Sequence, residues 1–148
     1  MTAGTANLLC DQGSTFTTTV AWTDSGGTAI NLTGYNARMD VRFAQTKEAD
    51  LVLQLNQANG RCTVPSGDKS TGIFTLKISA ADTAALTAGT YYYDLEVFSV
   101  DSTSPVYVQR LIQGKFTVNP EVTGLPMFQL AAQCPMLSFL AIRSRLQR

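Results

Sequence analysis

The strongest constraint on the fold is a two-residue alternation of apolar and polar side chains that returns in several short stretches. In residues 37–43, alanine, methionine, valine and phenylalanine occupy the odd positions, and Arg38, Asp40 and Arg42 lie between them. Successive side chains of a β-strand point to opposite faces of its sheet. Residues 37–43 are therefore predicted to form a half-buried strand with an apolar face toward a core and a charged face outward.

A longer stretch, Gly89–Phe98, is predicted to be the central strand of the domain. One face carries an apolar series suited to a core, consisting of Tyr91, Tyr93, Leu95 and Val97. The other face is mixed, with Tyr92, Asp94, Glu96 and Phe98, as on a sheet face that is partly wet or partly covered by a partner. Residues 79–87 precede this strand and predict a short helical turn, with Ser79 as N-cap and Asp82 in the first turn.

The remaining strand signals are short and separated by turn residues. Strands are expected in residues 16–22, 51–55, 61–64, 73–78, 106–112 and 115–118, with Phe74, Leu76 and Ile78 pointing inward in the fourth of these. Residues 30–35 are expected to form a short extended piece that ends at a glycine. Such spacing predicts an all-β protein, an immunoglobulin-like antiparallel β-sandwich of about seven or eight strands with one short helical turn. No cysteine–tryptophan–cysteine arrangement typical of antibody domains is present, so the prediction concerns architecture alone.

Three segments follow from this pattern. Residues 1–15 are small and polar and are expected to form an N-terminal arm or an edge. Residues 16–123 are expected to form the sandwich, and residues 124–148 an apolar and basic C-terminal extension that is partly helical and serves for interaction or anchoring.

Length and charge indicate a single domain and argue against a nucleic-acid-binding or membrane-spanning protein. At 148 residues the chain forms one domain, and its charged fraction of 15% is below the roughly 25% usual for soluble domains, which suggests that partners cover part of its surface. The formal net charge is zero, so no basic field favours nucleic acid. The N-terminus has no pattern of a signal peptide, and the apolar zone of residues 125–142 is interrupted by Gln129, Gln133 and Pro135, so no membrane span is expected.

Residue types needed for common catalytic chemistry are missing or dispersed. The sequence contains no histidine, no glycine-rich phosphate loop and no Cys-x-x-Cys pair. Cys10, Cys62 and Cys134 lie far apart and are expected to be reduced thiols. The chain is therefore predicted not to be an enzyme and to need no cofactor or metal.

The charged strand faces are the first candidate interface. Arg38, Arg42, Tyr92 and Glu96 are its candidate residues, and a cross-strand ion pair between these arginines and Asp94 or Glu96 is expected. Less favoured interpretations are a carboxylate pair formed by Asp94 and Glu96, and an arginine site for a sulfate or sugar acid. A sugar-stacking platform of Trp22 with residues 91–93 is also disfavoured, because alternation leaves Tyr92 largely alone on the outer face.

The C-terminal extension is the second candidate interface. Apolar residues recur at spacings of three and four from Met127 to Ala141, as on one side of a helix that Pro135 would kink or divide. Its candidate contact residues are Met127, Phe128, Leu130, Leu137, Phe139, Leu140, Arg143 and Arg145. The segment could fold back on its own sandwich, dock into a neighbouring subunit or stay disordered, and the pattern leaves these alternatives open.

Four separated motifs resemble a known family. They are D-x-G-S-T-F at residues 11–16, I-N-L-T-G-Y-N-A-R-M-D-V-R at 30–42, I-S-A-A-D-T-A-A-L-T-A-G-T-Y-Y-Y-D-L-E at 78–96, and R-L-I-Q-G-K-F-T-V-N-P-E-V-T at 110–123. In order and spacing they resemble small structural proteins encoded by tailed bacteriophages and prophages. The pattern is also similar to the immunoglobulin-like N-terminal module of phage baseplate upper proteins.

This resemblance implies a virion component with a β-sandwich fold and no enzymatic activity, assembled in the host cytoplasm and contacting other virion proteins or copies of itself. It leaves three roles open: an adaptor in the tail, baseplate or fibre region, a capsid decoration or head-fibre protein, and a module that binds a host receptor or glycan. The resemblance covers residues 11–123, and the extension that follows is not part of the family pattern.

Overall fold

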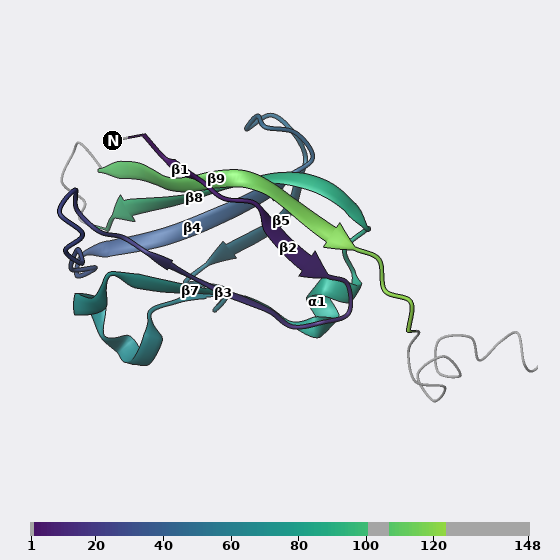
Figure 1. Cartoon of the computed structure of the whole chain (residues 1–148), viewed down its shortest axis with the longest axis horizontal. Coiled ribbons are helices and arrows are strands. Elements are labelled where there is room, and N and C mark those ends of the chain that lie inside the picture. The colour runs from purple at the N-terminus through teal and green to yellow at the C-terminus, as the bar shows by residue number, and fades with distance from the viewer. Residues whose placement is uncertain (1, 101–106, 124–148) are drawn as a thin grey trace, which may run out of the picture.

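The computed structural model describes residues 2–100 and 107–123, which form two β-sheets packed face to face (Figure 1). The larger sheet has the strand order β1-β9-β8-β4-β5, with β2 also paired to β9, and the smaller sheet has the order β3-β7-β6. The strands of the larger sheet are β1 (Gly4–Thr5), β2 (Leu8–Asp11), β4 (Tyr35–Arg42), β5 (Leu51–Asn56), β8 (Gly89–Ser99) and β9 (Val108–Asn119). Those of the smaller sheet are β3 (Phe16–Ala21), β6 (Cys62–Thr63) and β7 (Ile73–Ile78).

One short helix, α1 (Ala80–Ala84), and two 3₁₀ turns, Pro65–Gly67 and Lys69–Thr71, complete the described elements. The two sheets together form a β-sandwich. The predicted all-β sandwich with one short helical turn is confirmed. The predicted C-terminal extension lies outside the described residues.

The core lies between the sheets and is filled by the apolar faces of the alternating strands. On β8, the side chains of Tyr91, Tyr93, Leu95 and Val97 are buried, as predicted. They meet the buried odd-numbered residues of β4 and, from the smaller sheet, the fully buried Phe74, Leu76 and Ile78 of β7. The period of two in the sequence therefore identifies the core face of the three central strands.

The turn before β8 also forms as predicted. The Ser79 hydroxyl accepts a hydrogen bond from the Asp82 amide at 3.1 Å, which caps the N-terminus of α1. The Asp82 carboxylate in turn lies 2.8 Å from the Arg61 guanidinium. This contact ties the helix to the turn that leads into β6.

Alternation fails at the end of β4. Phe43 was expected on the core face, but β4 ends at Arg42 and the Phe43 side chain is 59% exposed. The pairing of β4 with β5 shifts register between Val41 and Arg42, and such a bulge breaks the period of two. The Phe43 ring instead packs edge-on against Tyr91, with ring centroids 5.3 Å apart.

The two strands expected around Gly114 are a single strand, β9. Glycine is needed at position 114 because the N-terminal segment, which runs alongside β9, approaches the strand there at very short range. A Cβ atom at position 114 would lie 1.9 Å from the Ala6 carbonyl oxygen. Glycine inside a strand therefore marks a close approach of two backbones and not a break between strands.

The segment of residues 2–11 forms an edge of the larger sheet. β1 and β2 both run parallel to β9, with Gly4 opposite Ile112 and Leu8 opposite Phe116, whereas the other strand pairs are antiparallel. Between them, the Ala6 amide donates to the Gln113 carbonyl at 3.0 Å, and the Tyr93 hydroxyl donates to the Ala6 carbonyl at 2.8 Å. Burial raises the pKa of this tyrosine to about 12, so the hydroxyl keeps its proton and remains a donor.

Two of the three cysteines are part of this core. Cys10 on β2 and Cys62 on β6 are buried and carry free thiols. Burial raises the pKa of the Cys62 thiol to about 11 and also raises that of Cys10, where the neighbouring Asp11 carboxylate adds to the effect. Both thiols are therefore protonated and weakly reactive at neutral pH.

Replacing Gly114 by alanine is expected to displace the N-terminal segment from β9. The added methyl group would overlap the Ala6 backbone, and overpacking of this kind costs about 1–3 kcal/mol of unfolding free energy. Urea denaturation measures this loss.

Gly4→Ala is the matched control, because the nearest atom to its new Cβ is a methyl group of Ile112 at 3.5 Å. Its unfolding free energy should stay within about 0.5 kcal/mol of the parent protein. Equal stabilities of the two variants would contradict the close approach at Gly114.

Candidate functional site

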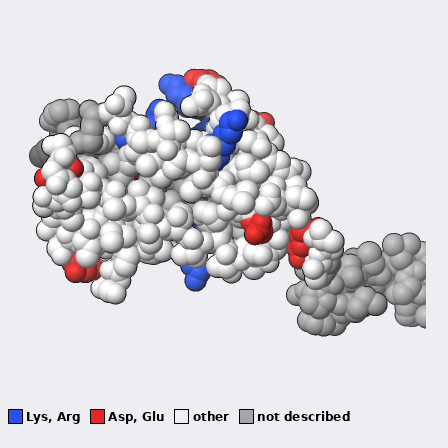
Figure 2. Space-filling view, in the orientation of Figure 1, with Lys and Arg blue, Asp and Glu red and all other residues white. Residues whose placement is uncertain are grey.

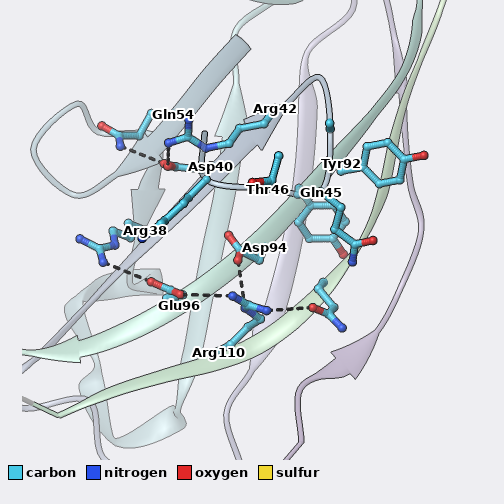
Figure 3. A pocket seen from close by; sticks show the side chains of 14 residues that line it. Arg38, Asp40, Arg42, Gln45, Thr46, Gln54, Tyr92, Asp94, Glu96 and Arg110 are labelled. Atoms are coloured by element: carbon cyan, nitrogen blue, oxygen red, sulfur yellow. Dashed lines mark hydrogen bonds and ion pairs between the residues drawn. The ribbon is translucent and has the colours of Figure 1, made fainter. Parts of the chain in front are cut away.

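The outward side of the larger sheet carries a polar hollow of about 480 Å³ (Figure 3). Side chains from β4, β5, β8 and β9 line it, and residues 44–47 form one wall. We define the polar face as Arg38, Asp40, Arg42, Gln54, Tyr92, Asp94, Glu96, Arg110 and Gln113. All four interface residues predicted on the strands, Arg38, Arg42, Tyr92 and Glu96, line this hollow.

Strand register brings these side chains together. In the antiparallel pairing of β4 with β8, Arg38 lies opposite Glu96 and Arg42 lies opposite Tyr92. The Arg38 guanidinium is 3.2 Å from the Glu96 carboxylate, which confirms the predicted cross-strand ion pair. The same guanidinium lies 5.3 Å from the centroid of the Phe98 ring. Two contacts thus hold the Arg38 side chain along the sheet surface.

Arg42 has a different partner from the one expected. Because Tyr92 lies opposite to it, its guanidinium pairs along its own strand with Asp40, at 2.8 Å. Its other terminal nitrogen donates to the Ala49 carbonyl at 2.8 Å. Arg42 therefore fixes the loop between β4 and β5 that forms the wall of the hollow.

Arg110 is the residue of the site that sequence reasoning missed. Its guanidinium lies 2.9 Å from Asp94 and 3.8 Å from Glu96. It reaches this position because the pairing of β8 with β9 shifts register between Leu95 and Glu96, so that Arg110 lies opposite Glu96. Unbroken alternation would place Leu111 there, and no sequence signal marks the bulge.

Asp40 and Asp94 lie directly opposite each other, an arrangement of like charges that destabilises a sheet unless cations and donors offset it. The Gln54 amide donates to Asp40 at 2.9 Å, in addition to the ion pair with Arg42. Burial raises the pKa of the Asp94 carboxyl, and the Glu96 and Asp40 carboxylates raise it further, while Arg110 and Arg42 oppose this rise. The surroundings of Asp94 therefore disfavour its charged form.

The carboxylates of the polar face are each engaged by an arginine. Asp94 and Glu96 share the guanidinium of Arg110 and so do not form an isolated carboxylate pair. Within residues 2–100 and 107–123, no cluster of three or more histidine, cysteine, aspartate or glutamate side chains could hold a metal ion. The described helices include none that is long and apolar enough to cross a membrane.

The aromatic residues do not form a common sugar-stacking platform. Tyr91 and Tyr93 are buried in the core, and Trp22 is only 5% exposed, with its ring 5.1 Å from that of Tyr35. The Tyr92 ring lies on the polar face (Figure 3). The eight candidate residues of the C-terminal extension, from Met127 to Arg145, lie outside the described part of the chain.

Comparison with known proteins adds no relative. No protein-family model matches the chain, and a search of curated proteins found no match.

The Asp94 carboxyl is expected to titrate above 3.8, its ordinary pKa, because it is partly buried beside two other carboxylates. The folded protein then holds this proton more tightly than the unfolded chain. The contribution of Asp94 to the unfolding free energy consequently falls as pH rises from 3.8 through its folded pKa. Carboxyl ¹³C NMR titration measures the midpoint.

Asp82 provides the internal comparison. Hydrogen bonds from Ser79 and then Arg61 lower the pKa of this carboxyl, so its stabilising contribution is present above 3.8 and is lost as pH falls through the folded pKa. Arg110→Gln should raise the midpoint of Asp94 further and leave that of Asp82 unchanged. A midpoint for Asp94 at or below that of Asp82 would contradict the electrostatics described above.

Proposed function

We propose that this protein is a non-enzymatic structural component of a bacteriophage virion, an adaptor in the tail, baseplate or fibre region that docks onto other virion proteins in several copies. Two features support this proposal. The four motifs in residues 11–123 resemble phage structural proteins in order and spacing. The polar face supplies a surface whose chemistry suits contact with a protein.

The observation that carries the proposal is the network of ion pairs on the polar face. Arg38 with Glu96, Arg42 with Asp40 and Arg110 with Asp94 each hold a long side chain in a defined position on a paired strand. Side chains that are already ordered lose less conformational entropy when a partner binds. Fixed charges of both signs also select partners with a complementary pattern.

The charge balance of the hollow argues against a nucleic-acid partner. Its lining contains four cationic side chains, Arg38, Arg42, Lys47 and Arg110, and three acidic ones, Asp40, Asp94 and Glu96. Nucleic-acid surfaces need an excess of cations to neutralise phosphates. A balanced lining is better suited to a protein surface of mixed charge.

A capsid decoration or head-fibre protein is the alternative, because the same sandwich could dock onto the shell through the same face. A receptor- or glycan-binding module is a second alternative, favoured only by the position of the Tyr92 ring beside polar groups of the hollow. Saturable sugar binding by the isolated protein would favour that module over the adaptor.

The proposed location predicts density for the sandwich on the tail or baseplate in cryo-electron microscopy of intact particles, with head and tail reconstructed separately. Deleting residues 125–148 should abolish incorporation while the sandwich stays folded, since the described strands all precede this segment. Density at regular positions on the shell would make the protein a decoration protein. Normal incorporation of the truncated protein would refute an anchoring role for the extension.

Exchanging the charges of one ion pair tests the polar face directly. The double variant Arg38→Glu with Glu96→Arg keeps an ion pair at 38 and 96 but reverses the charge that a partner meets. Because Glu96 also lies 3.8 Å from Arg110, the variant is expected to keep its fold with a lower unfolding free energy. It is expected to be incorporated into particles at least about tenfold less, as measured by quantitative mass spectrometry of purified particles.

Lys77→Glu is the control variant, since this exposed residue of β7 lies on the smaller sheet. It should leave incorporation unchanged. Equal incorporation of both variants would exclude the polar face as the docking surface.

A further inference from the structure

The smaller sheet ends in a strand that nothing in the described chain covers. β3 pairs only with β7, so its other side is an open edge six residues long. The edge is open because the N-terminal segment, which could have lined it, pairs with β9 in the other sheet. Unpaired backbone amides and carbonyls on such an edge form a template for another strand.

The register identifies which backbone groups are free. The Trp22 amide donates to the Gly72 carbonyl at 2.7 Å, which makes the even-numbered residues of β3 the ones that bond to β7. The amides and carbonyls of Thr17, Thr19 and Ala21 therefore point away from the sheet. Their side chains are exposed on its outer face.

Other edges in the described chain are protected in ways that β3 is not. On β5, the Gln54 carbonyl accepts hydrogen bonds from the side chains of Asn59 and Arg61, and the Asn56 amide donates to the Asn59 side chain. β6 and β1 have two residues each, and β2 has four. No described side chain donates to or accepts from the backbone of β3, and the strand contains no charge, proline or bulge.

We propose that β3 pairs with β3 of a second copy of this chain, antiparallel across a twofold axis, and joins two three-stranded sheets into one. Centring the axis on Thr19 places this residue opposite Thr19 of the second copy, and Thr17 opposite Ala21. These are the residues whose backbone groups point outward, so each pairing forms both hydrogen bonds of a narrow antiparallel pair.

A second copy suits this edge because the strand is uncharged and self-complementary. A twofold axis places a surface against itself, which would bring like charges together on a charged strand. Residues 16–21 carry none, and Figure 2 shows an uncharged surface over the middle of β3. The threonines that meet across the axis are β-branched and form favourable cross-strand pairs. The pairing is independent of the proposed role in a virion, since it uses the sheet opposite the polar face.

Sedimentation equilibrium of the full-length protein tests the proposal up to about 1 mM, because a contact made by one strand pair belongs to the small, weak class of interfaces. Dimerisation is expected, together with increasing protection of the Thr17, Thr19 and Ala21 amides from hydrogen exchange as the concentration rises. A protein that stays monomeric over this range would overturn the proposal.

Thr19→Lys is expected to abolish the dimer, since it places two like charges directly opposite each other at the axis. Thr63→Lys is the matched control: it makes the same change at an exposed residue of β6, on the opposite edge of the same sheet, and should leave the dimer intact. Thr17→Lys is a second edge variant should Thr19→Lys fail to fold.

A dimer that persists in both edge variants, or one whose Thr17, Thr19 and Ala21 amides exchange as in the monomer, would show that another surface carries the association and would overturn the proposal. Loss of these amides' protection in Thr19→Lys alone, with Thr63→Lys unaffected, would support it. Protection that appears only on adding an extended peptide from another protein would assign the edge to that partner and overturn the pairing of two copies.

Discussion

The backbone ladder on both sides of β8 is the interaction on which the rest of the structure depends. β8 pairs with β4 along eight residues on one side and with the twelve-residue β9 on the other. This central position holds one side of the strand in the core, where Leu95 and Val97 are fully buried. Asp94 and Glu96, which alternate with them along the strand, are thereby held on the polar face. Core and candidate docking surface are thus two sides of one ladder.

The bulges in this ladder shape the polar face. A regular sheet would carry Leu111 beside Glu96, and the register shift replaces it with Arg110. The guanidinium offsets the cost of placing Asp94 opposite Asp40. The irregularity at the end of β4 accompanies the loop that Arg42 fixes over the hollow. The site therefore depends on small departures from regular pairing, as bulges near functional surfaces often do.

The route of the N-terminal segment determines which edges of the sandwich stay open. Its parallel pairing with β9 covers the β9 side of the larger sheet and leaves β3 with a single neighbour. Gly114 is required for this route, since any larger residue would meet the Ala6 backbone. Gly114 thus allows the N-terminal segment to cover the β9 edge of the larger sheet, which leaves the β3 edge of the smaller sheet open. The two proposed contacts, through the polar face and through β3, lie on different sheets and could be made at the same time.

Local pattern by itself determined the all-β class, the buried faces of β4, β7 and β8, and the cap at Ser79, because the period of two and the capping preference act over a few neighbouring residues. It also placed Arg38 and Glu96 on outward faces. Only the tertiary structure decided that Arg110 joins them, that Phe43 leaves the core and that β9 is continuous through Gly114. These outcomes depend on register shifts and on the close approach of two backbone segments distant in sequence. The free energies that select them come from pairings that no local window contains.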